Sequence, residues 1–521
     1  MSEAPWSLSA TDLADRLRSG ALTSRAAVEA HLARIDVLDP QVHAFTTVLA
    51  AEARAEADAR DAEQARGRIR GPLHGMPVTV KECFDIEGLP TTLGLGSRRD
   101  TRARRDAAMV TILREAGAVI LGRTNLSQTM LFAESRNPLF GQTANPFSRL
   151  HSAGGSSGGE AAAVAAGMSP LGLGTDIGGS IRSPAGFCGI CGFKPTLDRW
   201  PMHGVGTVLR GQEAVRSQCG PLARTVGDLA LYFEALDPVR MSALDPRVPP
   251  LPWVSHRTVD VSTLRVGYYT DDGMIPVSRA VTRAVERARD VLRARGLVAV
   301  PFTPPDVPGM MELYLRAVSA DGGAALVAAV GDDPLDPSLQ ALARVANLSP
   351  RVRGVLTRAA SLAGQDRTAR LLDSVGEKSV SAYWALVDAL RGYRARMVDA
   401  LHRAQIDVVL CPTYTTPALP HGMSKNFTLA SSPAMVWNVV QFPAGTVPVT
   451  RVRPEETVRP HPRDLLERHA ARVDAQSEGL PVCVQVVAHP WRDHEALAVM
   501  AALESALHGA PDCPRTPVDP R

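Results

Sequence analysis

The sequence predicts an α/β fold. Short runs of β-branched and apolar residues alternate with longer segments of helical periodicity, and this alternation is typical of layered α/β domains. Hydrophobic residues make up 45% of the 521 residues and charged residues 21%, as in ordinary globular chains and unlike disordered ones. Because no stretch of about 18 uninterrupted apolar residues occurs, no transmembrane helix is expected.

The first part of the chain, residues 1–72, is expected to be a helical segment that packs on a catalytic domain formed by residues 73–521. Residues 26–35 carry apolar side chains at near-helical spacing, and residues 51–66 form an Ala/charged run without Gly or Pro. The texture changes from Leu73 onward. A β-branched run predicts a strand that ends on Lys81, followed by a helix over 107–116 and a strand over 118–121.

Glycine is concentrated in residues 150–192. A Gly/Ser loop over 153–159 precedes an Ala-rich helix, and a second Gly-rich segment follows at 171–180. Farther along, the pattern predicts a strand over 264–269, a helix over 278–295 and a strand over 298–300. Amphipathic helices are expected in a variable insert over 338–406, and strands at 406–410, 445–449 and 482–487.

Composition narrows the function classes. The chain has 57 basic and 54 acidic residues, and this near-balance argues against a dedicated nucleic-acid binder. The first residues lack the apolar core of a signal peptide, and seven scattered cysteines suit reduced thiols, so a cytoplasmic location is expected. Lysine is scarce: only Lys81, Lys194, Lys378 and Lys425 occur, and the other 53 basic residues are arginine. Each lysine therefore raises the question of whether its position needs an amine that can lose a proton, as arginine cannot.

The Gly/Ser segment allows three interpretations. Phosphate binding is disfavoured because Glu160 stands where a phosphate-binding loop needs lysine. Tight turns are the ordinary interpretation of one Gly-rich loop, but two such loops with serines lie close together. In the third interpretation Ser180, after two glycines, is a nucleophile beside backbone N–H groups that bind an anion. His151 is then read as a lone surface histidine, and neutral Lys81 is the candidate base.

The motifs resemble those of the amidase signature family. The resemblance is strong over about 73–230, where the spacing is 75 residues from Lys81 to Ser156 and 24 from Ser156 to Ser180. The matching blocks are Val80–Cys83, Gly154–Gly159, Gly174–Arg182, Gly192–Thr196 and Gly220–Arg224. The resemblance implies an amidase-signature fold, with a large twisted mixed β-sheet covered by helices on both faces.

The resemblance also implies a Ser–Ser–Lys triad. Ser180 would form the acyl-enzyme, Ser156 on a cis peptide bond would relay the proton, and Lys81 would be the final base. The oxyanion hole would consist of the N–H groups of Ile177, Gly178, Gly179 and Ser180. No cofactor and no metal are implied. Neutral Lys81 near pH 7 requires its pKa to fall by about 3 units, which burial can supply. Lys194 is interpreted as a structural contact, and the pair Asp176–Arg182 as a buried ion pair that holds the loop.

Further blocks are similar to those of the fatty acid amide hydrolase branch. They include residues 81–84, 137–143, 187–192, 442–450 and 479–485. This similarity implies hydrolysis of long-chain acyl amides, such as N-acylethanolamines, to fatty acid and amine. Acyl binding needs an apolar tunnel that ends at Ser180. The expected contacts are Met130, Leu131, Thr175, Ile177, Trp437 and Val447.

Other functions stay open at this point. The substrate is alternatively a small aryl, aliphatic or peptide amide. A second alternative is the A subunit of a tRNA-dependent amidotransferase, and a third is a non-catalytic protein with the same fold. The amphipathic segment at about 338–372 is expected either to touch a membrane peripherally or to pack on protein, and a homodimer is a further expectation. No nucleic-acid partner is expected.

Overall fold

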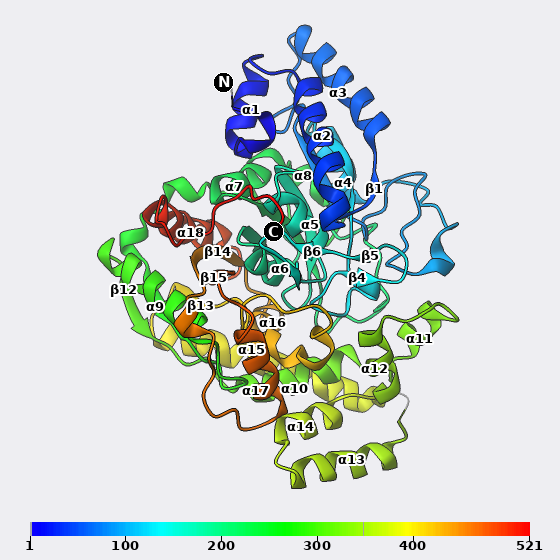
Figure 1. The fold of residues 1–521 in the computed structure, drawn as a ribbon, viewed down its shortest axis with the longest axis vertical. Helices are drawn as coiled ribbons and strands as arrows, with labels where there is room; N and C mark the ends of the chain where they lie inside the picture. The colour runs from blue at the N-terminus through cyan, green and yellow to red at the C-terminus, as the bar shows by residue number, and fades with distance from the viewer. Residues whose placement is uncertain (1–2, 347) are drawn as a thin grey trace.

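A computed structural model describes residues 3–346 and 348–521. Its centre is an eleven-stranded mixed sheet in the described part of the chain, with helices around it (Figure 1). In spatial order the strands are β1 (Phe45–Val48), β3 (Val119–Thr124), β2 (Pro77–Lys81), β8 (Leu171–Asp176), β10 (Gln218–Ala223), β9 (Cys191–Lys194), β14 (Ala444–Arg451), β15 (Pro481–Ala488), β13 (Val408–Pro412), β11 (Arg265–Tyr268) and β12 (Val298–Pro301). The α/β prediction is therefore confirmed.

The sheet is parallel near each end and antiparallel in the middle. Strand β2 pairs in parallel with both β3 and β8, and β11 pairs in parallel with β12 and β13. The pairs from β8 through β10, β9, β14 and β15 to β13 are antiparallel. Two small hairpins, β4 (Arg136–Asn137) with β5 (Gly141–Gln142) and β6 (Ala144–Asn145) with β7 (Ser148–Ser152), lie before the Gly/Ser loop.

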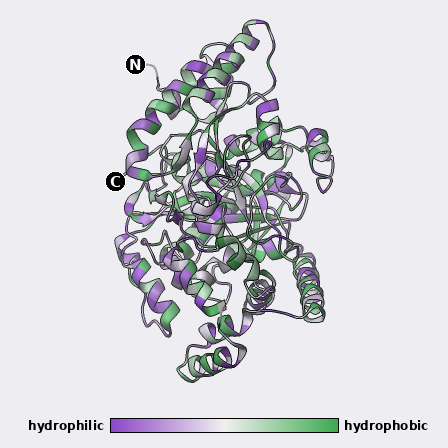
Figure 2. Ribbon diagram, turned by 90° about the vertical axis from the view of Figure 1, so that its right-hand side faces the viewer, coloured by the Kyte–Doolittle hydropathy of each residue, from purple (hydrophilic) through white to green (hydrophobic). Residues whose placement is uncertain are grey.

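Helices form a large part of the remaining chain. In the first part they are α1 (Ala10–Arg18), α2 (Ser24–Val42), α3 (Ala50–Ala65), α4 (Ala108–Glu115), α5 (Gly158–Ala165), α6 (Arg182–Phe187), α7 (Val226–Ala235), α8 (Pro238–Leu244) and α9 (Arg279–Ala294). They continue with α10 (Val307–Val318), α11 (Ala324–Val330), α12 (Pro337–Ala346), α13 (Pro350–Leu362), α14 (Asp366–Ser374), α15 (Val380–Arg403), α16 (Ser432–Val439), α17 (Leu465–Asp474) and α18 (Asp493–Leu507). Viewed side-on, the helices alternate hydrophilic and hydrophobic stretches (Figure 2).

Both faces of the sheet are covered. Side chains alternate between the faces of a strand. In β3, Val119 and Leu121 belong to an apolar cluster with α2, α3 and α5, whereas Ile120 belongs to the larger cluster that includes α4, α7, α9 and α18. Strand β2 follows the same rule, with Val78 and Val80 in the larger cluster. Thr79 and Lys81 therefore face the α5 side of the sheet.

The N-terminal segment is not only helical. Residues 45–48 form β1, which pairs antiparallel with β3 at the edge of the main sheet. The run Phe-Thr-Thr-Val has high strand propensity, but it spans four residues between two longer helices, so a window of helical periodicity hides it. Strands β8, β9 and β10 were not predicted either, because glycines interrupt their apolar pattern. The Pro-rich stretch near 237–253 begins with the short helix α8.

Candidate active site

Lys81 is the last residue of β2, and its side chain is fully buried. Its Nζ lies 2.6 Å from Ser156 Oγ and 2.9 Å from Thr175 Oγ1. Burial in this layer lowers the pKa of Lys81 to about 8, because the charged form loses its hydration. A substantial fraction of neutral amine near neutral pH is what a base in this position needs.

Ser156 follows a cis peptide bond with Gly155, in the loop between β7 and α5. The loop is packed against residues 132–135: a Cβ on Gly155 would lie 2.5 Å from both Phe132 O and Glu134 N. Glycine is therefore required at position 155 by the close approach of backbone. The packing aims the Ser156 hydroxyl at Lys81.

Asp176 organises the turn that carries Ser180. Its Oδ1 accepts a hydrogen bond from Gly179 N at 2.8 Å, and its Oδ2 accepts one from Ile181 N at 3.1 Å. Gly179 has φ +105°, a conformation that favours glycine. The carboxylate also pairs with Arg182 at 2.9 Å, with both side chains fully buried. Burial alone would raise the pKa of Asp176, but the charge and hydrogen bonds of Arg182 hold it well below its usual range. Asp176 and Arg182 thus form the buried ion pair that was expected from the sequence.

Three backbone donors of this turn remain free for an anion. Within the part of the chain that the structure describes, the N–H groups of Ile177, Gly178 and Ser180 have no acceptor. The expectation for Gly179 is wrong, because its N–H is already bonded to Asp176. The side-chain-free turn therefore offers three donors, not four, beside the Ser180 hydroxyl.

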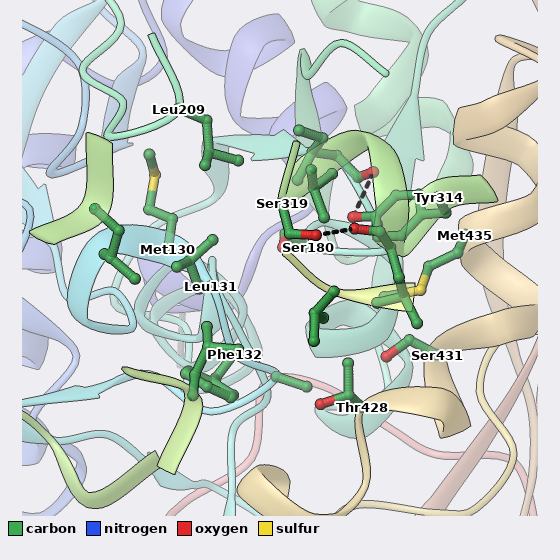
Figure 3. A pocket seen from close by; sticks show the side chains of 18 of the residues that line it. Met130, Leu131, Phe132, Ser180, Leu209, Tyr314, Ser319, Thr428, Ser431 and Met435 are labelled. Carbon is green, nitrogen blue, oxygen red and sulfur yellow. Dashed lines mark hydrogen bonds between the residues drawn. The ribbon is translucent and has the colours of Figure 1, made fainter. Parts of the chain in front are cut away.

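An apolar cavity of about 170 Å³ ends at Ser180. Figure 3 shows Met130, Leu131, Phe132 and Leu209 on one side of it and Ser180, Tyr314 and Met435 on the other. The predicted contacts Met130, Leu131 and Ile177 line this cavity. Phe132, Leu209, Tyr314, Leu315, Leu326 and Leu342 line it as well, and no sequence motif marked them.

A second pocket reaches the same serine from another direction. It is lined by Ser156, Thr175 and Ser180 at its inner end and by charged residues toward solvent. The predicted contact Thr175 lines this pocket and not the apolar one. Asp198 and Arg216 pair through two hydrogen bonds at 2.9 and 2.7 Å, so part of the polar wall is held rigidly. Ser180 thus lies between an apolar cavity and a second pocket with a mixed polar and apolar lining.

Two predicted contacts lie elsewhere. Trp437 is fully buried in α16 and packs against Phe442, with ring centroids 6.0 Å apart. Helix α16 presents Met435 to the cavity, and two residues later the side chain has turned about 200° to the opposite face. Val447 is fully buried within β14, where its neighbour strands are β9 and β15. Both are core residues.

The other candidate bases make no hydrogen bond to Ser156 or Ser180. His151, expected at the surface, is buried, and its Nδ1 lies 2.8 Å from Ser148 Oγ. Lys194 is buried and donates to Pro195 O at 3.0 Å, as a structural contact would, and burial lowers its pKa to about 7. Lys378 is half-buried and Lys425 is exposed.

The chain matches known proteins over most of its length. A family model described as Amidase matches residues 26–497. The chain is 38% identical over 513 residues to fatty-acid amide hydrolase 1 of Sus scrofa, covering 97% of this chain and 87% of that protein. It is 32% identical over 511 residues to fatty acid amide hydrolase 1 of Caenorhabditis elegans, covering 96% and 89%.

Structural similarity points the same way. A solved structure of fatty acid amide hydrolase superposes with a TM-score of 0.85 at 28% identity, covering 97% of this chain and 86% of that one. A more distant relative, a glutamyl-tRNA(Gln) amidotransferase subunit of Streptomyces coelicolor, is 30% identical over 515 residues and covers 96% of each chain. The sheet, the Gly/Ser loops and these matches agree: the chain belongs to the amidase family and is an amide-hydrolysing enzyme similar to fatty acid amide hydrolases.

Proposed function

We propose that the protein is a serine amidase that hydrolyses long-chain fatty acid amides, such as N-acylethanolamines, through an acyl-enzyme on Ser180. The observation that carries the proposal is the apolar cavity that ends at Ser180, next to the Lys81–Ser156 hydrogen bond. An acyl chain gains about 0.8 kcal/mol for each CH₂ that it buries, so such a cavity favours longer chains over short ones.

The proposed reaction begins with proton transfer out of Ser180. Lys81 Nζ, when neutral, accepts the proton of Ser156 Oγ, and Ser156 accepts the proton of Ser180 Oγ. Ser180 Oγ then forms a bond to the acyl carbon, and the carbonyl electrons move onto oxygen. The N–H groups of Ile177, Gly178 and Ser180 donate to this oxyanion, and one such donor contributes about 10²–10³ in rate in other serine hydrolases.

Collapse of the tetrahedral intermediate breaks the C–N bond. The leaving amine takes a proton that returns from Lys81 by way of Ser156, which leaves the triad neutral again. Water then attacks the acyl-enzyme and gives up a proton along the same path to Lys81. When the bond between the acyl carbon and Ser180 Oγ breaks, this proton returns through Ser156 to Ser180 Oγ, and the fatty acid is released. No step needs a cofactor, because each proton that leaves Lys81 is one that it had received.

The two spaces beside Ser180 suit the two halves of such a substrate. The acyl chain would occupy the apolar cavity, and the amine head would occupy the second pocket, where Thr175 and the Asp198–Arg216 pair supply polar groups. A hydroxylated or otherwise polar amine fits this wall better than a second long alkyl chain, since buried polar groups need partners.

Peripheral membrane contact through the segment near 338–372 is part of the proposal. Helix α13 exposes Val355 by 66% and Leu362 by 90%, while Leu342 of the adjacent α12 lines the apolar cavity. Figure 1 shows α13 at the edge of the molecule, beyond α12 and α14. An exposed apolar face on the helix that follows α12 would let a lipid-like substrate approach from a bilayer surface. None of the helices in the described residues is long and apolar enough to span a membrane.

Vesicle sedimentation tests this contact. Wild-type protein should co-sediment with phosphatidylcholine/phosphatidylglycerol vesicles, and the double variant Val355→Ser, Leu362→Ser should stay in the supernatant with unchanged hydrolysis of a dispersed short amide. A wild-type protein that never sediments but elutes as a dimer would assign the same face to a second copy of the chain.

A series of ethanolamides with increasing acyl length tests the substrate assignment. The proposal expects kcat/KM to rise with acyl chain length until the chain fills the apolar cavity. A maximum at acetyl or aryl amides would instead assign the protein to amidases of small amides. Hydrolysis that requires a co-purified partner protein would favour the amidotransferase alternative.

A further inference from the structure

One buried carboxyl group near the catalytic lysine has no part in the proposed mechanism. Glu160 lies on α5, four residues after Ser156, and its side chain is fully buried. Its Oε2 accepts a hydrogen bond from Thr79 Oγ1 at 2.7 Å, and its Oε1 accepts one from Thr124 Oγ1 at 2.7 Å. In the described part of the chain, no basic side chain lies within 4.0 Å of this carboxyl group. Ionising a buried carboxyl group that has no basic partner is costly, so its place needs a reason.

The placement points to Lys81. Thr79 and Lys81 are next-but-one residues of β2, so their side chains lie on the same face of the sheet. Gly172, opposite Thr79 on β8, leaves room for the carboxyl group: a Cβ there would lie 2.2 Å from Glu160 Oε2. Strand β2 therefore carries Lys81 and Thr79, the hydrogen-bond partner of Glu160, on one face. Gly172 leaves the room that the Glu160 side chain occupies.

The other charged groups around this layer are committed elsewhere. On β8 and α6, Asp176 and Arg182 form an ion pair with each other. Glu82, directly after β2, accepts hydrogen bonds from Thr92 Oγ1 and Leu93 N.

Two more groups lie on the elements packed around Glu160. On β3, Arg123 points to the opposite face from Thr124 and donates to Pro90 O at 2.7 Å. On α7, Tyr232 has a buried hydroxyl, and burial together with nearby Glu160 raises its phenol pKa well above the usual range. Among the groups on the packed elements, Lys81 is thus the base left for Glu160 to balance.

We propose that Glu160 is a positioning residue for the catalytic base: a buried acid that offsets the positive charge Lys81 acquires when it takes the proton of Ser156. The proposal rests on the function proposed above and extends it. Lys81, Ser156 and Ser180 carry the proton transfer, whereas Glu160 acts on Lys81 through its electric field and holds the β2 side chains through Thr79.

Electrostatics determine in which direction Glu160 changes the pKa of Lys81. Acylation creates an ammonium ion at Lys81 in a buried layer, where charges interact strongly. The Cys83 thiol and the Asp176 carboxylate also act on Lys81, but Cys83 contacts Thr175 Oγ1 and Asp176 is paired with Arg182. Burial lowers the pKa of Lys81 to about 8 and raises that of Glu160 to about 8, so both groups titrate in the same range. Ionised Glu160 favours protonated Lys81. A neutral side chain in its place therefore lowers the pKa of Lys81 and also makes the ammonium intermediate less stable.

The test is Glu160→Gln, read by the rate at which a fluorophosphonate labels Ser180 between pH 5 and 10. The acid limb of the labelling rate should move to lower pH, because Glu160 is partly ionised in the range where Lys81 titrates. For amide hydrolysis at the plateau, kcat should fall about tenfold while KM stays the same. General loss of structure would lower the rate at every pH. It would not move the acid limb of the labelling rate to lower pH while also lowering kcat.

Variants of Thr79 keep the test decisive if Glu160→Gln does not fold. Thr79→Val should move the acid limb in the same direction by a smaller amount, because it removes one hydrogen bond to the carboxylate, and Thr79→Ser should restore the wild-type profile. An acid limb at the wild-type pH in folded Glu160→Gln, or in folded Thr79→Val if the first variant is insoluble, overturns the proposal. If the reagent labels the Ser180→Ala variant as fast as the wild-type protein, the proposed function itself is refuted. This outcome is distinct from failure of the Glu160 proposal.

Discussion

Replacing Lys81 by arginine removes the proton-accepting ability of the base while keeping its charge. With a pKa of about 8, about one Lys81 in eleven is neutral at pH 7. An arginine with a pKa of at least about 12.5 is neutral in about three molecules per million at the same pH. The ratio predicts a loss of about 30,000-fold in kcat/KM for amide hydrolysis, if neutral side chain 81 is the base.

The assay compares initial rates of ethanolamide hydrolysis for wild type, Lys81→Arg, Lys81→Met and the control Lys425→Arg. Lys425 is exposed, so its replacement should leave the rate unchanged. Lys81→Met is neutral and similar in length but cannot accept a proton, so it should be as inactive as Lys81→Arg. Circular dichroism and thermal unfolding establish that each variant is folded. Folded Lys81→Arg that retains more than about one-hundredth of the wild-type rate would refute the assignment of Lys81 as the base.

Three further outcomes follow from the site. The wild-type hydrolysis rate should rise about tenfold from pH 7 to pH 9, because Lys81 acts when deprotonated and its pKa is about 8; a rate that falls over this range would contradict a neutral-amine base. Asp176→Asn should lower the free energy of unfolding in urea by about 3–5 kcal/mol, since it leaves Arg182 buried without its counter-charge. The fluorophosphonate should also label Ser180 of this variant slowly. An unfolding midpoint equal to that of the wild type would show that the ion pair is not needed. Leu131→Trp should shift the preferred acyl length toward shorter chains by filling the cavity, whereas the same change at exposed Leu150 should not; parallel length profiles would mean that the acyl chain lies elsewhere.

The residues proposed to carry the chemistry could be marked from the sequence because they sit in local motifs. Glycines around Ser156 and Ser180 are imposed by close backbone packing, and this requirement leaves a pattern over a few residues. Lys81 could be found because it ends a β-branched run. Whether Gly179 N–H is free, in contrast, depends on the side chain of Asp176, and a motif does not say which of four donors that carboxylate has already taken.

The walls of the cavity were harder to predict for a physical reason. Tyr314, Leu326 and Leu342 come from α10, α11 and α12, far along the chain, where any apolar residue on the inward face satisfies the fold. Trp437 and Val447 were placed at the cavity by sequence likeness, but helix α16 turns Trp437 into the core, and β14 buries Val447 in the sheet. Strand β1 is not predicted from the sequence, because its four residues become a strand by pairing with β3, which lies far along the chain.

Mass spectrometry of the acyl-enzyme tests the central claim most directly. Wild-type protein is mixed with a long-chain acyl amide, quenched in acid within the first turnover and digested. The account predicts an acyl adduct on the peptide that contains Ser180, absent in Ser180→Ala and strongly reduced in Lys81→Met. An adduct on another residue, or steady hydrolysis by Ser180→Ala at the wild-type rate, would contradict it.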